Sequence, residues 1–341
     1  DGSYWVWIPR YAYKIESCYH TSGEDCLALT GKEAGDIDVK FLKSTTNITE
    51  DNTTIQSTGY EAHIKDTSMH HFLHPAFQFN GEELGFWVAK FEPTAHEELL
   101  SGTTSGSCNS LDNVSTKSPL IIPNATSWRC INVSTAFNVS LEMKNKTETY
   151  GWLPEEVDTH MMTNLEYGAI VYLTTSKYGA PDEIWNNSNS KYLTGCSGLG
   201  IDDSSHPDCI EYSTVIGQKA STTYNINGVY DMKGGAFERV MANYNNLVAY
   251  SGFDSIEVIK SIKNKYLTKY VTLSNDLIEG HGMRYDALIY GDAIYETSFD
   301  AAIYNGSNRE GTTLGSWYYD RSYLAHINFP WLNRGGHYSN S

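Results

Sequence analysis

The prediction of the fold rests first on residues 227–238, which read Asn227-Gly228-Val229-Tyr230-Asp231-Met232-Lys233-Gly234-Gly235-Ala236-Phe237-Glu238. Two adjacent glycines permit backbone conformations that residues with a Cβ rarely adopt, so the stretch predicts a tight turn. Asp231, Glu238 and Arg239 leave two interpretations open at this point. They are either groups for acid–base chemistry or charges that anchor the turn.

Short apolar and aromatic runs on both sides of this stretch predict β-strands. Residues 4–9 and 11–15 are predicted to form an N-terminal strand pair, and residues 86–91 another strand. The polar, Thr-rich residues 43–68 are predicted to be loop. After about residue 280, short aromatic runs alternate with glycine and turn residues, which favours strand and loop.

Two segments have helical character. Thr163 with Glu166 three residues later is the pattern of a capping box, and the following apolar residues recur at roughly helical spacing until Gly179. Residues 255–268 carry a weaker pattern, with isoleucines on one stripe and lysines outside it. Both helices are predicted to support a sheet, so the fold class is α+β.

Composition limits the possible functions. The 341 residues include 24 Lys and Arg against 41 Asp and Glu, a formal net charge of −17. Such a surface repels phosphate backbones, which argues against a nucleic-acid partner. No window approaches the roughly 18 apolar residues of a membrane span, and no signal-peptide pattern follows Asp1. We expect a soluble chain, processed or not, that forms a single domain over residues 1–341.

Six cysteines form three couples that are close in sequence, and none has the CxxC spacing of a zinc site. Six cysteines allow 15 pairings, so other pairings and buried free thiols stay open beside the three local disulfides that we predict. The predicted pairs are Cys18 with Cys26, Cys108 with Cys130, and Cys196 with Cys209.

Asn-X-Ser/Thr sequons are crowded in the first half of the chain. Five lie within residues 95–150, which we interpret as a glycosylated insertion and not a second core, although a Ser/Thr/Asn-rich loop could form sequons by chance. Glycans and disulfides together predict an extracellular location, on a cell or virion surface. The nine sequons begin at Asn47, Asn52, Asn113, Asn124, Asn132, Asn138, Asn145, Asn186 and Asn305.

Two groups of residues carry side chains that could ligate a metal ion. The HHxxH pattern could hold a metal, but Pro75 breaks a helix there, and we expect none. Acidic loops could bind a structural calcium, which stays open although no EF-hand loop is present. We expect no other cofactor. The residues concerned are His70, His71 and His74, and Glu50, Asp51, Asp202, Asp203 and Asp208.

Five stretches, in order, resemble motifs of the formylglycine-generating-enzyme-like (sulfatase-modifying factor) family. The stretch 227–238 resembles the signature G-[LV]-Y-D-M-x-G-N-[VA]-W-E-W. Together the five matches are more specific than any one alone. The others are Trp5–Pro9 for V-x-I-P, Phe86–Thr94 for F-x-[IM]-x-K-[YF]-E-V-T, Met162–Ala169 for V-T-N-V-S-W-x-x-A, and Leu332–Gly336 for L-R-G-G-S-W.

The resemblance implies a C-type-lectin-type fold, in which short strands and about two helices present a ligand-facing sheet. In that family the glycine turn is a buried scaffold, which favours the anchoring interpretation of its charges. His74-Pro75-Ala76-Phe77 is similar to a bacterial, archaeal and phage branch that includes pilin-like surface proteins and relatives of retroelement variable proteins. The family's enzymes need a C-terminal cysteine pair, and no cysteine follows Cys209. We therefore expect no enzymatic activity and no catalytic residues.

The C-terminal segment is rich in Tyr, Asn, Ser, Asp and His, the residues of antibody-like binding surfaces. Ordinary strand residues packing under residues 334–336 would give the same composition, so both interpretations stay open. The candidate ligand-binding residues are Trp317, Tyr318, Tyr319, Asp320, Arg321, Tyr323, His326, Asn328, Asn333, His337 and Tyr338.

The sequence is compatible with three functions. The leading hypothesis is an N-glycosylated adhesin or receptor-binding display protein of an archaeon, bacterium or virus, which binds a protein or glycan on another surface. The second is a subunit of an extracellular, pilus-like filament of identical copies, in which a neighbour supplies the strand that the family usually has after Gly336. The third is an oxidase like the family's enzymes.

Overall fold

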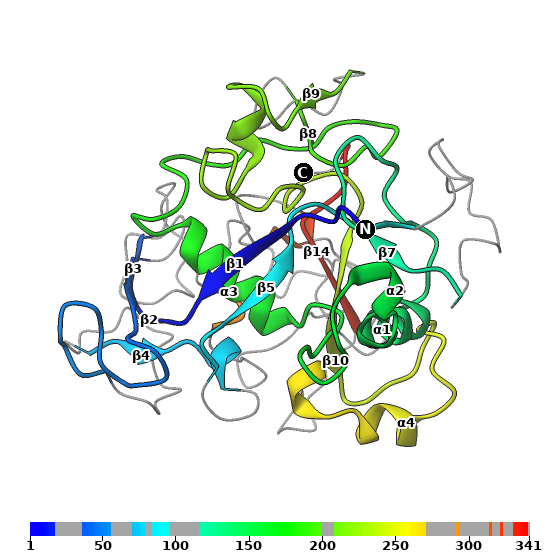
Figure 1. Ribbon diagram of the computed structural model, residues 1–341, viewed down its shortest axis with the longest axis horizontal. Coiled ribbons are helices and arrows are strands. Elements are labelled where there is room, and N and C mark those ends of the chain that lie inside the picture. The colour runs from blue at the N-terminus through cyan, green and yellow to red at the C-terminus, as the bar shows by residue number, and fades with distance from the viewer. Residues whose placement is uncertain are drawn as a thin grey trace.

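The computed structural model describes residues 1–17, 36–55, 70–78, 83–95, 116–198, 208–270, 291–293, 314–315, 321–322 and 330–339. Helices and short strands alternate along the chain, and the strands form several small sheets (Figure 1). The predicted α+β class is confirmed. No helix in these ranges is long and apolar enough to cross a membrane.

The bounds of the elements are as follows. The helices are α1 (Val133–Glu142), α2 (Thr147–Tyr150), α3 (Asn164–Thr174) and α4 (Ile256–Ser261), with 3-10 turns η1 (Pro75–Phe77), η3 (Met143–Asn145), η4 (Gly217–Ala220) and η5 (Asn264–Tyr266). The strands are β1 (Trp5–Pro9), β2 (Tyr11–Ser17), β3 (Asp36–Phe41), β4 (Phe72–Leu73), β5 (Gly85–Ala89), β6 (Thr94–Ala95), β7 (Pro119–Leu120), β8 (Cys196–Ser197), β9 (Ile210–Glu211), β10 (Glu238–Tyr244), β11 (Thr268–Tyr270), β12 (Leu314–Gly315), β13 (Arg321–Ser322) and β14 (Trp331–Arg334).

The two N-terminal strands are confirmed, but the prediction that they pair with each other is wrong. β1 pairs with β5 in antiparallel fashion, whereas β2 pairs with β3 and β4. Only Arg10 separates β1 from β2, and an antiparallel hairpin needs a turn of at least two residues. The chain therefore passes from one sheet to another at Arg10.

Helix α3 lies in the centre of the main core. Thr163 accepts a hydrogen bond from the backbone of Glu166, and the Glu166 side chain bonds the backbone of Thr163, so the predicted capping box is confirmed. Most side chains of α3 are buried, and the helix packs against η1, β3 and β10. In Figure 1 α3 runs behind the β1–β5 pair.

Strand β10 follows the glycine turn and connects two cores. It is the middle strand of a three-stranded sheet, parallel to β11 and antiparallel to β14. Val240 and Ala242 belong to the core around α3, whereas Met241 on the opposite face packs with Val133 and Phe137 of α1. The residues that follow the turn thus lie at the centre of the molecule.

Helix α1 corrects the expectation for residues 95–150. Residues 116–150 include α1 and α2, and buried side chains of α1 form part of the second core. Asn132 caps α1 by accepting a hydrogen bond from the N–H of Thr135 at 2.8 Å. Sequon-rich composition concealed this helix because its polar residues lie on the outer side. Residues 96–115 lie outside the described ranges.

The helix predicted over 255–268 is shorter than expected. Ser255 caps α4, which ends at Ser261 because Ile262 has an extended backbone, and the chain then enters β11. The strand predicted at 86–91 is confirmed as β5, which begins one residue earlier and ends two residues earlier than predicted. Residues 43–55 form turns and bridges, as expected for loop, and residues 56–69 are outside the described ranges.

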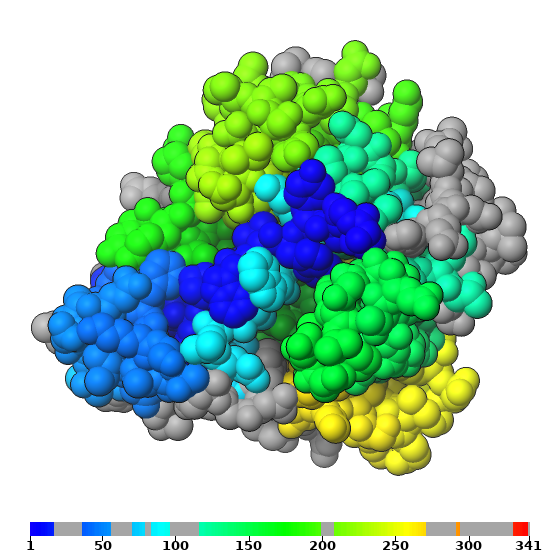
Figure 2. Space-filling view, viewed as in Figure 1, coloured from blue at the N-terminus to red at the C-terminus, as the bar shows by residue number. Residues whose placement is uncertain are grey.

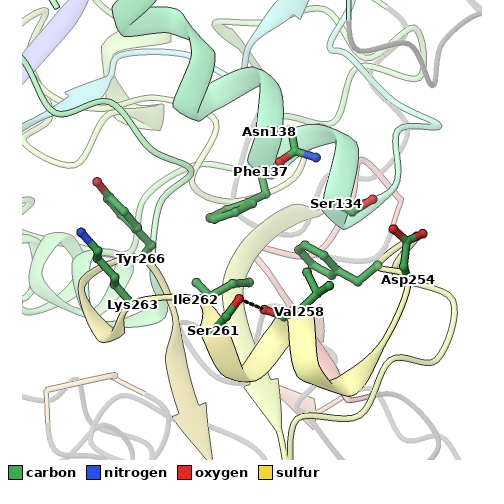
Figure 3. Close-up of a pocket in the computed structure, with 11 residues that line it drawn as sticks. Ser134, Phe137, Asn138, Asp254, Val258, Ser261, Ile262, Lys263 and Tyr266 are labelled. Carbon is green, nitrogen blue, oxygen red and sulfur yellow. Dashed lines mark hydrogen bonds between the residues drawn. The ribbon is translucent and has the colours of Figure 1, made fainter.

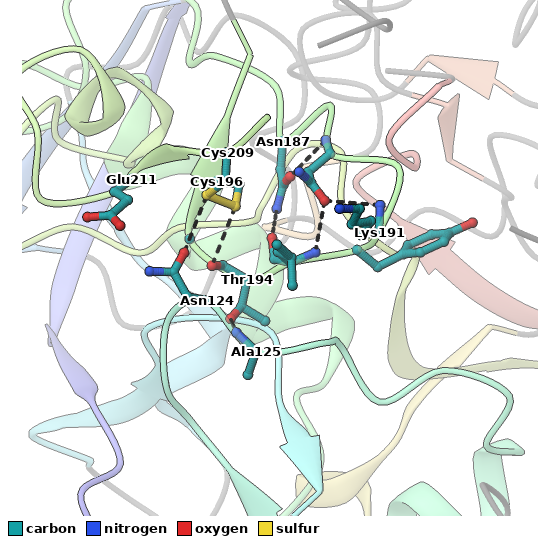
Figure 4. Close-up of a disulfide and its surroundings, with 12 residues drawn as sticks. Asn124, Ala125, Asn187, Lys191, Thr194, Cys196, Cys209 and Glu211 are labelled. Carbon is teal, nitrogen blue, oxygen red and sulfur yellow. Dashed lines mark hydrogen bonds between the residues drawn. A yellow bond between two sulfur atoms is a disulfide. The ribbon is translucent and has the colours of Figure 1, made fainter. Parts of the chain in front are cut away.

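The disulfide between Cys196 and Cys209 is confirmed (Figure 4). It joins β8 to the residue before β9. Cys130 is also disulfide-bonded. The partner of Cys130 lies outside the described residues. Cys18, Cys26 and Cys108 also lie outside them, so the pairs Cys18–Cys26 and Cys108–Cys130 stay predictions.

Candidate functional site

A cavity of about 1020 Å³ lies between the β1–β5 pair, the start of β10 and the segment from 127 to 162. Figure 2 looks onto its mouth, between β1 and β5 in dark blue and cyan and the green segment that includes α1 and α2. Cavities of this volume hold drug-sized molecules or short polymer segments. We name this space the central cavity.

Tryptophans form one wall of the central cavity. Side chains alternate along a strand, so Val6 and Ile8 of β1 enter the main core, while Trp5 and Trp7 project from the opposite face. There Trp5 packs against a smaller buried cluster that includes Phe91. Trp87 lies opposite Trp7 in the β1–β5 register, and their ring centroids are 5.2 Å apart. Trp7 is 39% exposed and Trp87 63% exposed, a large apolar surface beside an open cavity.

Asp231 lies at the polar end of the cavity, where it organises the glycine turn. Its carboxylate accepts hydrogen bonds from the backbone N–H of Gly195 at 2.9 Å and Glu92 at 3.2 Å, and from Nδ2 of Asn187 at 2.8 Å. Burial raises the pKa of Asp231 to about 6, against the opposing effect of these donors. Three segments distant in sequence converge on this one carboxylate, as the scaffold interpretation expects.

Glu92 is a second buried carboxyl group beside Asp231. Glu92 accepts hydrogen bonds from the N–H of Ala236 at 2.8 Å and from the hydroxyl of Ser127. Burial raises the pKa of Glu92 well above its usual range, and the charge of Asp231 raises it further. Glu92 therefore keeps a proton at a pH where an isolated carboxyl group would lose it.

Arg239 is the unusual charged residue of the cavity. Its side chain is accessible and lines the cavity, yet surrounding protein desolvates the guanidinium and lowers its pKa. It makes no hydrogen bond or ion pair with the residues that the structure describes. Asn333 of β14 lies directly opposite it in the β10–β14 ladder. An unpaired guanidinium here can bind a carboxylate through two parallel hydrogen bonds.

The other cations of the lining have partners within the chain. Burial lowers the pKa of His160, but Glu166 and Asp158 together outweigh this effect, so the pKa of His160 is raised. The partnered groups are Arg129, whose guanidinium carbon is 3.7 Å from the ring centroid of Tyr192, His160, whose Nε2 is 2.9 Å from Oε1 of Glu166, and Lys265, which pairs with Asp158.

The predicted C-terminal ligand face is described only in part. His337 lines the central cavity, with its ring centroid 5.1 Å from that of Phe237. Tyr338 packs against Tyr192, another cavity residue, at 5.0 Å. Arg321 contributes its backbone to β13. Trp317, Tyr318, Tyr319, Asp320, Tyr323, His326 and Asn328 lie outside the described residues.

The histidines considered for metal binding have separate surroundings. His74 is buried between the rings of Tyr11 and Tyr13, and burial lowers its pKa to about 3. Nε2 of His71 lies 2.8 Å from Oδ2 of Asp38. His70 is exposed. Among the acidic residues considered for calcium, Asp51 pairs with Lys40, Glu50 and Asp208 are exposed, and Asp202 and Asp203 lie outside the described residues.

The sequon at Asn186 requires a correction. Asn186 is 0% exposed, and its side chain packs against the backbone of Gly234, so a glycan cannot be accommodated there in the folded chain. Asn52, Asn124, Asn138 and Asn145 are exposed, and Asn47 and Asn132 are half-buried. Figure 4 shows Asn124 beside the disulfide. Asn113 and Asn305 lie outside the described residues.

A second hollow, of about 360 Å³, lies between α1 and α4 (Figure 3). Phe137 and Ile262 point into it, and Asn138 lies on its rim with its side chain directed away. The volume of this hollow is much smaller than the 1020 Å³ of the central cavity. The central cavity is therefore the stronger candidate site.

Sequence reasoning missed the central cavity. The alternation of Trp5 and Trp7 with Val6 and Ile8 was available as a signal, since it places two tryptophans on one face of a strand. No sequence pattern indicates that Arg239 lacks a partner among the described residues, because this depends on which side chains the fold places near it. No protein-family model matches the chain, and no curated protein is similar to it in sequence. The family resemblance is thus a prediction from motifs alone.

Proposed function

We propose that the chain is a non-enzymatic extracellular binding protein, of the adhesin or receptor-binding type, whose ligand enters the central cavity. The observation that carries this proposal is the pair Trp7 and Trp87, which expose their rings at the cavity wall. Exposed aromatic surface next to a concave site is typical of binding sites, because contact with a ligand removes it from water. Paired rings also give contact area at a low cost in conformational entropy.

Two observations support the extracellular part of the proposal. The disulfide between Cys196 and Cys209 would persist in an oxidising compartment. Exposed sequons at Asn52, Asn138 and Asn145 could carry glycans without disturbing the cores. The C-type-lectin-type arrangement implied by the sequence motifs is compatible with these features and belongs to the same proposal.

The carboxyl groups of the cavity support a binding role over a catalytic one. Asp231 uses both oxygens to hold backbone N–H groups, and Glu92 holds the backbone of Ala236. A group that must change its protonation in each catalytic cycle would disturb these bonds. Their arrangement favours a rigid support for the cavity wall.

Binding of the purified glycosylated chain to arrays of extracellular proteins, peptides and glycans tests the proposal. We expect specific binding that Trp87→Ala or Trp7→Ala weakens at least tenfold. Tyr250→Ala is the matched control, because Tyr250 is 93% exposed but does not line the cavity. Binding that survives both tryptophan substitutions, or no binding to any array, would contradict the proposal.

A further inference from the structure

We propose that the central cavity receives an extended polypeptide strand, which pairs with the free edge of β5 and presents an acidic side chain to Arg239. This rests on the binding function proposed above and specifies the class of partner. The partner is a segment of another protein with apolar residues on both faces and a carboxylate near its middle.

One edge of β5 has unpaired main-chain groups. The N–H of Arg10 bonds the carbonyl of Leu84 at 2.9 Å, and the N–H of Lys90 bonds that of Tyr4 at 3.0 Å. Hydrogen-bonded pairs alternate along an antiparallel ladder, so between these two bonds the even-numbered residues of β5 face β1. The N–H and C=O groups of Gly85, Trp87 and Ala89 therefore point away from β1, and no described residue bonds them.

This free edge faces the central cavity. All five consecutive residues of β5 line the cavity, whereas only Trp5 and Trp7 of β1 do so. Alternate residues line a space beside the face of a strand, but consecutive residues line a space beside its edge. In Figure 1 β5 lies on the side of β1 toward β10 and α1.

The surroundings of the edge fit a strand with apolar side chains on both faces. On the inner side, Phe86 and Val88 together with Met162 and Val240 offer apolar surface. On the outer side, Trp87 is exposed. An exposed, apolar strand edge promotes aggregation unless something covers it. Pairing with an added strand covers the edge and both apolar surfaces at once.

Arg239 supplies charge complementarity. It lines the same cavity from the start of β10 and lacks a partner among the described residues, while Glu92, Asp231 and Glu166 are held by donors of the chain itself. A carboxylate on the incoming strand would satisfy the guanidinium. The net charge of −17 does not prevent this, because charges beyond about 8 Å are largely screened at physiological ionic strength.

A polypeptide fits this edge better than a sugar. The free groups of β5 recur at every second residue, alternately as donors and acceptors, and only another main chain matches that repeat. Peptide recognition by strand addition takes its affinity from these main-chain bonds and its specificity from the alternating side chains. Here Arg239 would select an acidic residue.

The test begins with a random nine-residue peptide library on phage, selected against the immobilised full chain. We expect peptides that alternate in β-branched residues around an Asp or Glu. Hydrogen exchange with a selected peptide should slow at the amides of Trp87 and Ala89, but not at Val88, which already faces β1. A peptide N-methylated at the alternate residues whose N–H groups face β5 should not bind.

Substitutions distinguish the contribution of the Arg239 charge to peptide binding from that of the β5 edge. Arg239→Gln should weaken the acidic peptide at least tenfold and leave its Glu→Gln counterpart unchanged. Lys263→Gln, an equal charge change outside the cavity, should have no effect. Failure to enrich any strand-like peptide, or equally slow exchange at Trp87 and Val88 before peptide is added, would overturn the proposal. Tryptophan-dependent binding of glycans alone would also overturn it but would leave the binding function intact.

Discussion

Nη1 of Arg334 in β14 donates a hydrogen bond to Oδ1 of Asn164, the first residue of α3, at 2.8 Å. Arg334 is fully buried and also donates to the carbonyls of Asp292 and Ala293. The Asn164 amide donates to the hydroxyl of Tyr270 at 2.6 Å. This buried network joins the last described strand to the central helix.

Replacing Arg334 should therefore destabilise the fold strongly. Arg334→Met removes the hydrogen bonds that Arg334 donates to three buried acceptors, and we expect a loss of about 3 kcal/mol or more in the free energy of unfolding. The matched control is Arg239→Met, since Arg239 lies on the paired strand and has no described partner, and it should change stability by about 0.5 kcal/mol or less. Urea unfolding measures both, and equal losses would contradict the assignment of these roles.

Features that depend on neighbours in sequence could be predicted. The Thr163 capping box needs only a four-residue pattern, and the Cys196–Cys209 disulfide closes a short loop. Pairing of β1 with β5 could not be predicted, because nothing in residues 5–9 specifies a partner about 80 residues away. Helix α1 could not be predicted from composition, because its sequons and polar residues are equally typical of loop.

The candidate site was predicted less well than the fold. Trp5 and Trp7 were identified as strand residues, but their common face gained meaning only when the cavity beside it was known. The sequence predicts Arg239 either as an anchor of the glycine turn or as a group for acid–base chemistry, whereas the structure places its side chain in the cavity without a described partner. Such isolation is a property of the assembled fold, which no local pattern encodes.

Gly234 and Gly151 provide a matched pair for testing the glycine turn. Their φ angles are +82° and +81°, a region that disfavours residues with a Cβ. A Cβ on Gly234 would lie 1.7 Å from Oδ1 of Asn186, whereas nothing lies within 4 Å at Gly151. We expect Gly151→Ala to cost about 1 kcal/mol and Gly234→Ala about 3 kcal/mol or more. Similar costs in urea unfolding would exclude close packing as the reason for Gly234.

Glu92 should make the stability of the protein depend on pH in a direction opposite to ordinary carboxylates. Its folded-state pKa is raised above the ordinary 4.5, so the unfolded chain loses the proton first as pH rises. The stabilisation that Glu92 contributes to the folded state is therefore fully present below pH 4.5, and it is lost as pH rises through the pKa of Glu92 in the folded state. The Glu92→Gln variant should not show this loss. Its free energy of unfolding, relative to that of wild type, should therefore increase from pH 5 to pH 7.5.

Urea unfolding at both pH values measures this difference. Glu156→Gln, an exposed residue of the cavity lining, should run parallel to wild type. A constant difference between Glu92→Gln and wild type across the pH range would show that Glu92 is ionised in the folded protein.

Glycan occupancy should follow the exposure of each asparagine. We expect Asn138 and Asn145, which are exposed on and after α1, to carry glycans on protein from its native source. Asn186 should be unmodified, because its buried side chain lies against Gly234 and a glycan there would prevent the glycine turn from closing. Enzymatic deglycosylation in ¹⁸O-labelled water, followed by peptide mass spectrometry, marks each occupied site. Label at Asn186 would show that this loop packs differently, whereas its absence at Asn138 and Asn145 would remove the main support for a glycosylated surface.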